Sequence, residues 1–319
     1  MSTPLDSTYG AWLVSLFIET LLYGMGVLQT WIYFAGRPTD VASVKWTVLV
    51  VLALETIQVV FFFHSSYFRF VERFGQIQID LYWADSLQLL AAYLSAFIVQ
   101  LYFASRIHKL TKARRKLSLS AIGIYIIFLL AVFQIVAGIV QVILTYKLRS
   151  FLKLSETKAV TTLQSVTSLA CDILITTYLC LFLNTQKGEM MGTNMMMDVL
   201  IRDAINRGVL TALSSALNMV LFLALPNTFW FFLGLAPSSK LYMNSLLTTL
   251  NSRQHLRDKV AASDEGWNSI PMATMATRSG NMPKKIQGQA STAAVDFEMA
   301  SVEINGKTED FLPCPSWRT

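Results

Sequence analysis

Leu117–Tyr146 reads LSLSAIGIYIIFLLAVFQIVAGIVQVILTY, thirty residues without a single charged side chain. A helix that crosses the hydrocarbon core of a bilayer needs about 20 mostly apolar residues. The run is too long and too continuous for a barrel strand, in which apolar and polar residues alternate over about ten positions. This stretch therefore predicts a membrane-spanning helix.

Six further stretches predict the same kind of helix. Together the seven predicted spans are 10–35, 44–63, 81–105, 117–146, 159–183, 205–225 and 228–250. The first is too long for the apolar region of a signal peptide and has no basic residues before it. The last two are separated by Pro226-Asn227-Thr228, which predicts a tight turn in which Asn or Thr caps the next helix.

The composition agrees with an all-α, polytopic seven-helix bundle. Of 319 residues, 54% are hydrophobic and 14% charged, and the mean hydropathy is +0.48, whereas soluble domains carry about 25% charged residues. This balance excludes a compact water-soluble enzyme and a disordered chain. With three cysteines, a disulfide-stapled secreted module is excluded too.

Three regions follow from the spans. We expect residues 1–9 to form a short extracellular N-terminus and residues 10–255 to form the membrane domain. Residues 256–319 are rich in Ser, Thr, Pro, Gly and Asn and show no sustained helical periodicity. They predict a disordered cytoplasmic tail, because they bury too little apolar surface to offset the entropy of ordering.

The distribution of Lys and Arg predicts the orientation, because cytoplasmic loops carry the excess. With the N-terminus outside, thirteen basic residues flank the spans inside and six flank them outside. We therefore expect the N-terminus outside and the C-terminus in the cytoplasm, in the plasma membrane or an endomembrane. The basic run Arg106–Lys116 lies between two spans, which favours anionic lipid headgroups as its partner and argues against a nucleic acid.

Five ionisable residues lie within the spans: Glu19, Glu55, Asp85, Asp172 and Lys240. Each costs about 2.5–3.5 kcal/mol at the centre of a bilayer, so we expect these side chains to face the interior of the bundle. Asp85 lies near the outer boundary, and the others lie deeper by the 1.5 Å rise of a helix.

Polar residues recur every three or four positions around these groups, which places them on one face of each helix. The five stripes are Ser15, Glu19, Tyr23, Gly26 and Thr30; Gln134, Gly138, Gln141 and Thr145; Thr161, Ser165, Ser168, Asp172 and Thr176; Thr211, Ser215 and Asn218; and Lys240, Asn244, Thr248 and Asn251. They predict a hydrated or hydrogen-bonded centre.

We hypothesise that Lys240 forms an ion pair with Glu55, with Asp172, or with both. Two interpretations stay open. The polar contacts only hold helices together, or they line a ligand or ion pocket, whose candidate residues are Glu19, Glu55, Asp85, Asp172, Lys240 and Asn244.

We expect no cofactor and no metal. A lysine in the last span is typical of a retinal Schiff base, but Ala236, one turn earlier, is not a carboxylate. The three histidines lie at span ends or in the tail, so they cannot supply facing haem ligands. The methionines between 190 and 197 suit Cu(I) but are more typical of an adaptable apolar surface. We expect no enzyme, since no hydrolase motif or phosphate loop occurs.

Several short segments resemble one family. They are Leu22-Tyr23-Gly24 with Gln29 and Tyr33-Phe34; Val99–Ile107; Ile205–Thr211; and, as the most specific part, Lys240–Leu247 running to Leu250–Arg253. Residues 10–255 are similar to a fungal, mainly basidiomycete, family of seven-span integral membrane proteins catalogued as a domain of unknown function. The family commonly has Asp where this chain has Glu55. The resemblance implies the architecture and a fungal origin, and it carries no assigned activity or site residues.

Three functions remain after these exclusions. A receptor or sensor fits seven spans, an external N-terminus and a cytoplasmic tail, and it implies a small-molecule ligand and a cytoplasmic protein partner. A transporter or channel fits the charges at mid-membrane depth, but the chain has no internal repeat, and one span carries an interior proline, Pro237. A scaffold would use every polar stripe for packing. We rank the receptor first.

Overall fold

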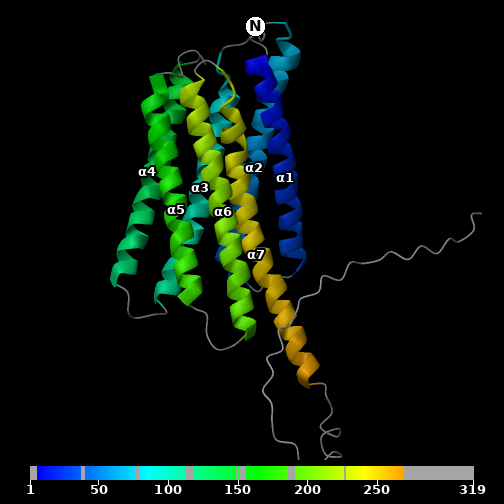
Figure 1. Cartoon of the computed structure of the whole chain (residues 1–319). Coiled ribbons are helices and arrows are strands. Elements are labelled where there is room, and N and C mark those ends of the chain that lie inside the picture. Colours follow the sequence, from blue (N-terminus) through cyan, green and yellow to red (C-terminus); the bar gives the residue numbers. More distant parts are fainter. Residues whose placement is uncertain are drawn as a thin grey trace, which may run out of the picture. The chain divides into compact units, whose positions relative to one another are not determined.

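The computed structural model describes residues 6–36, 40–75, 80–112, 118–148, 150, 156–185, 191–225 and 228–268. Residues 1–269 belong to one compact unit. Its described part contains seven α-helices and two short π-helical segments (Figure 1). The helices are α1 (Ala11–Ala35), α2 (Ala42–Tyr67), α3 (Trp83–Lys112), α4 (Ser118–Leu148), α5 (Lys158–Thr185), α6 (Met191–Ala224) and α7 (Phe232–Asn268). The π-helical segments are η1 (Asp6–Gly10), which leads into α1, and η2 (Phe68–Glu72), which follows α2.

Six of these helices, α1 to α6, are long and apolar enough to cross a membrane. The chain is therefore consistent with a multi-pass membrane protein, and the predicted helical class is confirmed. The helix α7 is the exception because its composition is more polar. It contacts α1, α2, α3 and α6, so much of its surface faces protein.

Two helices are longer than predicted. Helix α6 begins at Met191, fourteen residues before the predicted start of its span. Helix α7 continues to Asn268, so the prediction of a disordered tail is wrong for residues 256–268. Neither extension contains a proline, the residue that most strongly ends a helix. The remainder of the predicted tail lies outside the described residues.

The turn between α6 and α7 also differs from its prediction. Pro226 and Asn227 lie outside the described residues, and Thr228 does not cap α7, which begins four residues later. The Thr228 hydroxyl instead donates to the carbonyl of Leu225, at the end of α6. In Figure 1 this turn lies at the same end of the bundle as the N-terminus.

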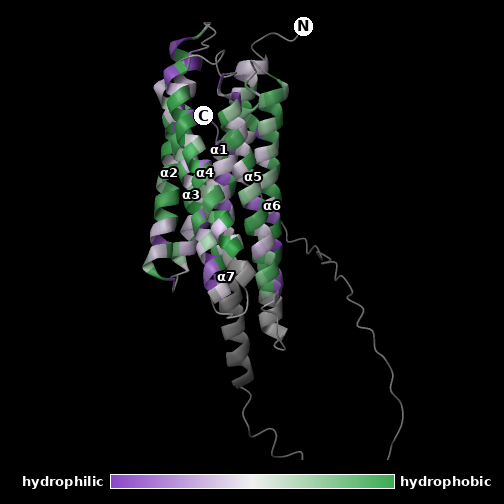
Figure 2. Ribbon diagram, turned by 90° about the vertical axis from the view of Figure 1, so that its left-hand side faces the viewer, coloured by the Kyte–Doolittle hydropathy of each residue, from purple (hydrophilic) through white to green (hydrophobic). Residues whose placement is uncertain are grey.

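Neighbouring helices pack in chain order, and α7 returns to pack against α1. Helix α3 contacts α2, α4, α5 and α7 and thus lies at the centre with α7. The outward surfaces are apolar: Phe17, Trp31 and Tyr125 are 64%, 74% and 70% exposed. Figure 2 shows apolar residues along the length of α2 and α6. Such a surface suits contact with lipid.

The inward surfaces carry the predicted polar stripes. On α4 all four stripe residues are buried, as are all three on α6. On α5 and α1 one member of each stripe, Thr176 and Tyr23, is half-buried. The stripe on α7 holds for Lys240 and Asn244 but is wrong for Thr248, which is exposed.

Two apolar clusters lie around this polar interior. At the end that carries the N-terminus, aromatic side chains pack against one another, with the Trp12 ring centroid 4.9 Å from that of Phe62 and 4.5 Å from that of Phe232. The Trp12 indole also donates to Ser66 Oγ at 2.8 Å. Towards the other end, a larger cluster includes Phe103 and Leu246.

Candidate functional site in the bundle interior

The six predicted site residues do not share one pocket. Glu19, Glu55, Lys240 and Asn244 lie where α1, α2 and α7 meet, Asp172 lies between α5 and α7, and Asp85 lies at the start of α3. These six residues therefore fall into three polar clusters.

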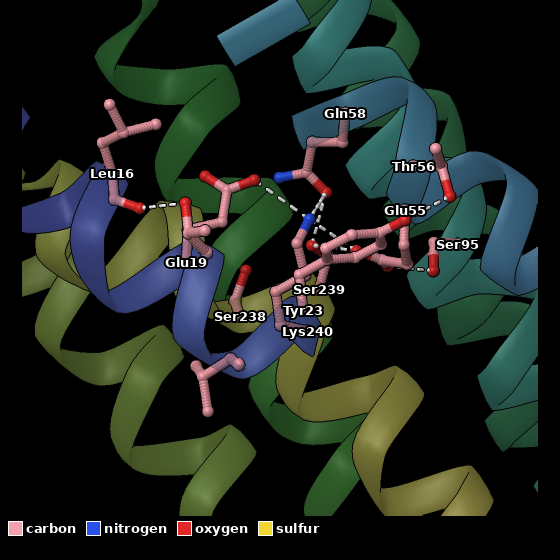
Figure 3. A network of polar contacts seen from close by, with 12 residues as sticks. Leu16, Glu19, Tyr23, Glu55, Thr56, Gln58, Ser95, Ser238, Ser239 and Lys240 are labelled. Atoms are coloured by element: carbon pink, nitrogen blue, oxygen red, sulfur yellow. Dashed lines mark hydrogen bonds and ion pairs between the residues drawn. The ribbon is translucent and has the colours of Figure 1, made fainter. Parts of the chain in front are cut away.

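The first cluster surrounds the ammonium of Lys240, which is fully buried (Figure 3). Lys240 Nζ lies 3.0 Å from Glu19 Oε1 and 2.7 Å from Glu55 Oε2. It also donates to Gln58 Oε1 at 2.8 Å. Glu55 and Gln58 are three residues apart and share the inward face of α2. We call Glu19, Glu55, Gln58 and Lys240 the Lys240 cluster.

Hydroxyl groups complete the surroundings of Glu55. Ser95, on α3, donates to Glu55 Oε1, and Ser239, next to Lys240, donates to Glu55 Oε2 at 3.1 Å. The same hydroxyl lies 2.6 Å from Gln58 Oε1, so its one proton is shared between the two acceptors. Both carboxylate oxygens of Glu55 therefore have partners.

Asn244 joins α1 to α7 one turn below Lys240. Its amide nitrogen donates to the carbonyls of Leu22 and Lys240, each at 2.9 Å. Its Oδ1 accepts no hydrogen bond from the part of the chain that is described. Asn244 thus positions Lys240 by holding the backbone of α7 against α1.

The predicted pair of Lys240 with Glu55 is confirmed, and the alternative pair with Asp172 is wrong. A helix has 3.6 residues per turn, so Lys240 and Tyr242 point to opposite sides of α7. Lys240 faces α1 and α2, whereas the Tyr242 hydroxyl donates to Asp172 Oδ2 at 2.5 Å. Gln100 is a longer partner of the Asp172 carboxylate, at 3.4 Å.

A buried arginine accompanies Asp172. Arg207, on α6, donates to Thr176, one turn along α5, at 3.4 Å, and interacts electrostatically with Asp172. Its guanidinium carbon lies 3.8 Å from the centroid of the Phe103 ring, a cation–π geometry. Arg207 was not predicted as a buried charge because the predicted sixth span begins only two residues before it.

The third cluster joins Asp85 to a second overlooked arginine. Arg69, in η2, lies 2.5 Å from Asp85 Oδ2 and is 1% exposed. The backbone nitrogen of Tyr82 donates to the same carboxylate oxygen at 2.8 Å. Arg69 follows the predicted end of the second span by six residues, and only the longer observed helix brings it back to the bundle.

A cavity of about 50 Å³ lies at the same end of the bundle as the N-terminus. Its polar lining comes from Gln58, Asp85, Gln88, Gln141, Thr145, Thr161 and Asn218, and aromatic rings come from Phe222, Phe231 and Phe232. Asp85 is the single charged lining group, and Arg69 compensates it. Thr145 Oγ1 is buried and has no hydrogen-bond partner in the described ranges. We call this space the first cavity.

A second cavity, of about 30 Å³, continues deeper between α3, α4, α5, α6 and α7. Ala92, Asn218 and Leu235 line both cavities. Gln134 lines the second cavity, is 3% exposed, and has an Oε1 without a partner among the residues described. The volumes suit a few waters or a small organic molecule.

The donor sets suit binding of neutral polar groups rather than metal coordination. Within the described ranges, no group of three or more His, Cys, Asp or Glu side chains is placed to hold a metal ion. Amides, hydroxyls and aromatic rings line the first cavity, while the interior charges are drawn into clusters with one another.

Comparison with known proteins places one part of the chain. No curated protein and no solved structure matches the chain. One family model matches residues 168–255, a segment that includes Asp172, Arg207 and Lys240 but not their partners on α1 to α3. A domain described as a family of unknown function, DUF6534, is found at residues 168–255.

Proposed function

We propose that the protein is a receptor-like membrane protein that binds a small uncharged molecule in the first cavity. The observation that carries this proposal is the cavity itself, where neutral polar groups from five helices meet three aromatic rings. Buried amides and hydroxyls fix the orientation of a ligand, and rings supply apolar contact. The function is a binding one, without catalysis or a cofactor.

Seven spans form part of the proposal. Helix α7 is too polar to qualify by composition, but α1, α2, α3 and α6 surround it. A helix shielded from lipid by protein does not need an apolar surface on every side. The resemblance to a fungal seven-span family supports the same count.

Lys and Arg are in excess at the span ends on the side of the membrane away from the N-terminus, and this excess supports an external N-terminus. The first cavity then faces the outside or the lumen, and α7 runs towards the cytoplasm. Exposed basic side chains at the inner ends, such as Lys109, are placed to bind lipid headgroups. A cytoplasmic protein partner would bind at the same ends and respond to a conformational change that the ligand causes.

The lining predicts the chemical class of the ligand. A charged ligand would remain uncompensated, because the Asp85 carboxylate is already paired with Arg69. An uncharged molecule with a hydrogen-bonding group and an apolar part matches the amides, hydroxyls and rings. A volume of about 50 Å³ limits it to a small molecule unless side chains move.

A thermal-shift assay of the purified protein in lipid nanodiscs tests the proposal. The probes are short-chain alcohols, ketones, lactones and amides, added over a range of concentrations. A binding compound at one hundred times its Kd stabilises the folded state by about 2.7 kcal/mol. We expect at least one class of probe to raise the melting temperature.

Ala92→Leu supplies the matched variant, because Ala92 lines both cavities and the added methyl groups occupy them. Ala53→Leu is the control, since Ala53 is exposed on α2. The shift should persist in Ala53→Leu and disappear in Ala92→Leu. No shift with any probe favours a scaffold, and flux of the bound probe across reconstituted vesicles favours a transporter. Either result contradicts the receptor proposal.

A further inference from the structure

The ammonium of Lys240 has all the partners that it can use. An ammonium has three N–H donors, and Lys240 Nζ lies within 3.0 Å of Glu19 Oε1, Glu55 Oε2 and Gln58 Oε1. Its charge is thus shared between two carboxyl groups and one amide.

The two carboxyl groups differ sharply in their surroundings. Glu55 accepts from Ser95 at one oxygen and from Ser239 and Lys240 at the other. Glu19 contacts Lys240 through Oε1 alone. Its Oε2 points away from the ammonium in Figure 3 and has no hydrogen-bond partner in the described part of the chain. Glu55 has the surroundings of a carboxylate, and Glu19 does not.

A count of the charges also indicates that only one of the two glutamates is ionised. Two ionised carboxylates and one ammonium leave one surplus negative charge in a site where Glu19 is 1% exposed and Glu55 fully buried. Removing an uncompensated charge from water is strongly unfavourable, whereas a neutral carboxyl group is far less so. Two buried arginines interact with other carboxylates: Arg69 pairs with Asp85, and Arg207 interacts with Asp172.

We propose that the Lys240 cluster is a proton-binding site and that the bound proton resides on Oε2 of Glu19. The cluster then holds one ammonium, one carboxylate on Glu55 and one neutral carboxyl group, and its net charge is zero. This site is separate from the first cavity and does not depend on the proposed ligand.

A metal cation does not fit the same place. Sodium and similar hard cations need several oxygen ligands at once, and the Lys240 ammonium already occupies the point where the Glu19, Glu55 and Gln58 oxygens converge. A proton needs only the free oxygen of Glu19.

The groups that face Glu19 determine how the stability of the folded state depends on pH. Helix α2 contributes Glu55, helix α7 contributes Lys240, and the α3 side chain that reaches the cluster is the uncharged Ser95. The folded state binds one proton more than an unfolded chain in which Glu19 is ionised. Stability therefore falls as the pH rises above neutral, because the unfolded state binds fewer protons.

Two isosteric variants of the full chain in nanodiscs test the assignment. Gln is the uncharged analogue of a protonated Glu, so Glu19→Gln should melt within about 2 °C of the wild type. Glu55→Gln forces the charge onto Glu19, which lacks the hydroxyl donors that Ser95 and Ser239 give Glu55, and should lower the melting temperature more than Glu19→Gln does. Between neutral and mildly alkaline pH, the wild type should lose more stability than Glu19→Gln.

Difference infrared spectroscopy provides the direct readout. A protonated-carboxyl stretch that shifts in heavy water should be present in the wild type and absent in Glu19→Gln, in which the Glu55 carboxylate alone balances the Lys240 ammonium. The proposal is overturned if the wild type lacks this band, if Glu19→Gln retains it, or if Glu19→Gln fails to fold. Stabilisation of the wild type by sodium at fixed ionic strength would also overturn it, since a cation would then be the bound species.

Discussion

Replacing Lys240 by methionine removes one positive charge and keeps a side chain of similar length. In the wild type, Lys240 Nζ lies 3.0 Å from Glu19 Oε1 and 2.7 Å from Glu55 Oε2. After the change, Glu55 keeps its Ser95 partner, and Glu55 and Gln58 share the one hydroxyl proton of Ser239. The perturbation thus leaves a buried carboxylate without its counter-charge.

Breaking a buried ion pair by removing one partner costs about 3–5 kcal/mol. Each kcal/mol lowers the melting temperature by roughly 2–4 °C in a protein of 150–250 residues. We therefore expect Lys240→Met to melt roughly 6–20 °C below the wild type. Removing the stranded charge as well should restore much of this loss, so Lys240→Met combined with Glu55→Gln should be more stable than Lys240→Met alone.

The assay is thermal unfolding in nanodiscs, with surface abundance in cells as a second readout. Lys147→Met is the matched control, because Lys147 is exposed at the end of α4 and should change the melting temperature by little. Normal abundance and an unchanged melting temperature for Lys240→Met would refute the claim that the ion pair supports the fold.

Two further variants test other contacts. Tyr242→Phe removes the hydroxyl donor to Asp172, at 2.5 Å, and should destabilise the protein by about 1–3 kcal/mol in thermal unfolding; an unaltered melting temperature would contradict the contact. Gly234→Ala should also destabilise by about 1–3 kcal/mol, because its Cβ would lie 2.4 Å from the backbone nitrogen of Asn218. Gly24→Ala is its control: its Cβ meets no atom within 4 Å, so equal losses would refute close packing of α6 on α7.

The helices and their inward faces were predictable because both depend on local patterns. A helix that crosses a bilayer needs a long apolar run. Polar residues that face the interior of the bundle recur along that run at helical spacing. On α4, for example, Gln134, Gly138, Gln141 and Thr145 all lie buried as their spacing indicated. Such patterns give the face of a helix without knowledge of its neighbours.

The pairing of charges was less predictable because it depends on which helices meet. Depth along the helices left both Glu55 and Asp172 as candidate partners of Lys240. The choice between them follows from the side of α7 that faces α2, which a single sequence does not encode locally. Arg69 and Arg207 were overlooked for a related reason. Both lie at or beyond predicted span ends, and the helices continue past those ends.

The distance between the Lys240 side-chain nitrogen and the glutamate carboxyl carbons tests the central claim most directly. Solid-state NMR on protein in lipid bilayers measures it, with labelled lysine nitrogen and labelled glutamate or aspartate carboxyl carbon, and Lys240→Met assigns the signal. The account predicts strong dipolar coupling to two glutamate carboxyls, reduced to one by either Glu19→Gln or Glu55→Gln. Coupling to aspartate instead, or no coupling to any carboxyl carbon, would contradict it.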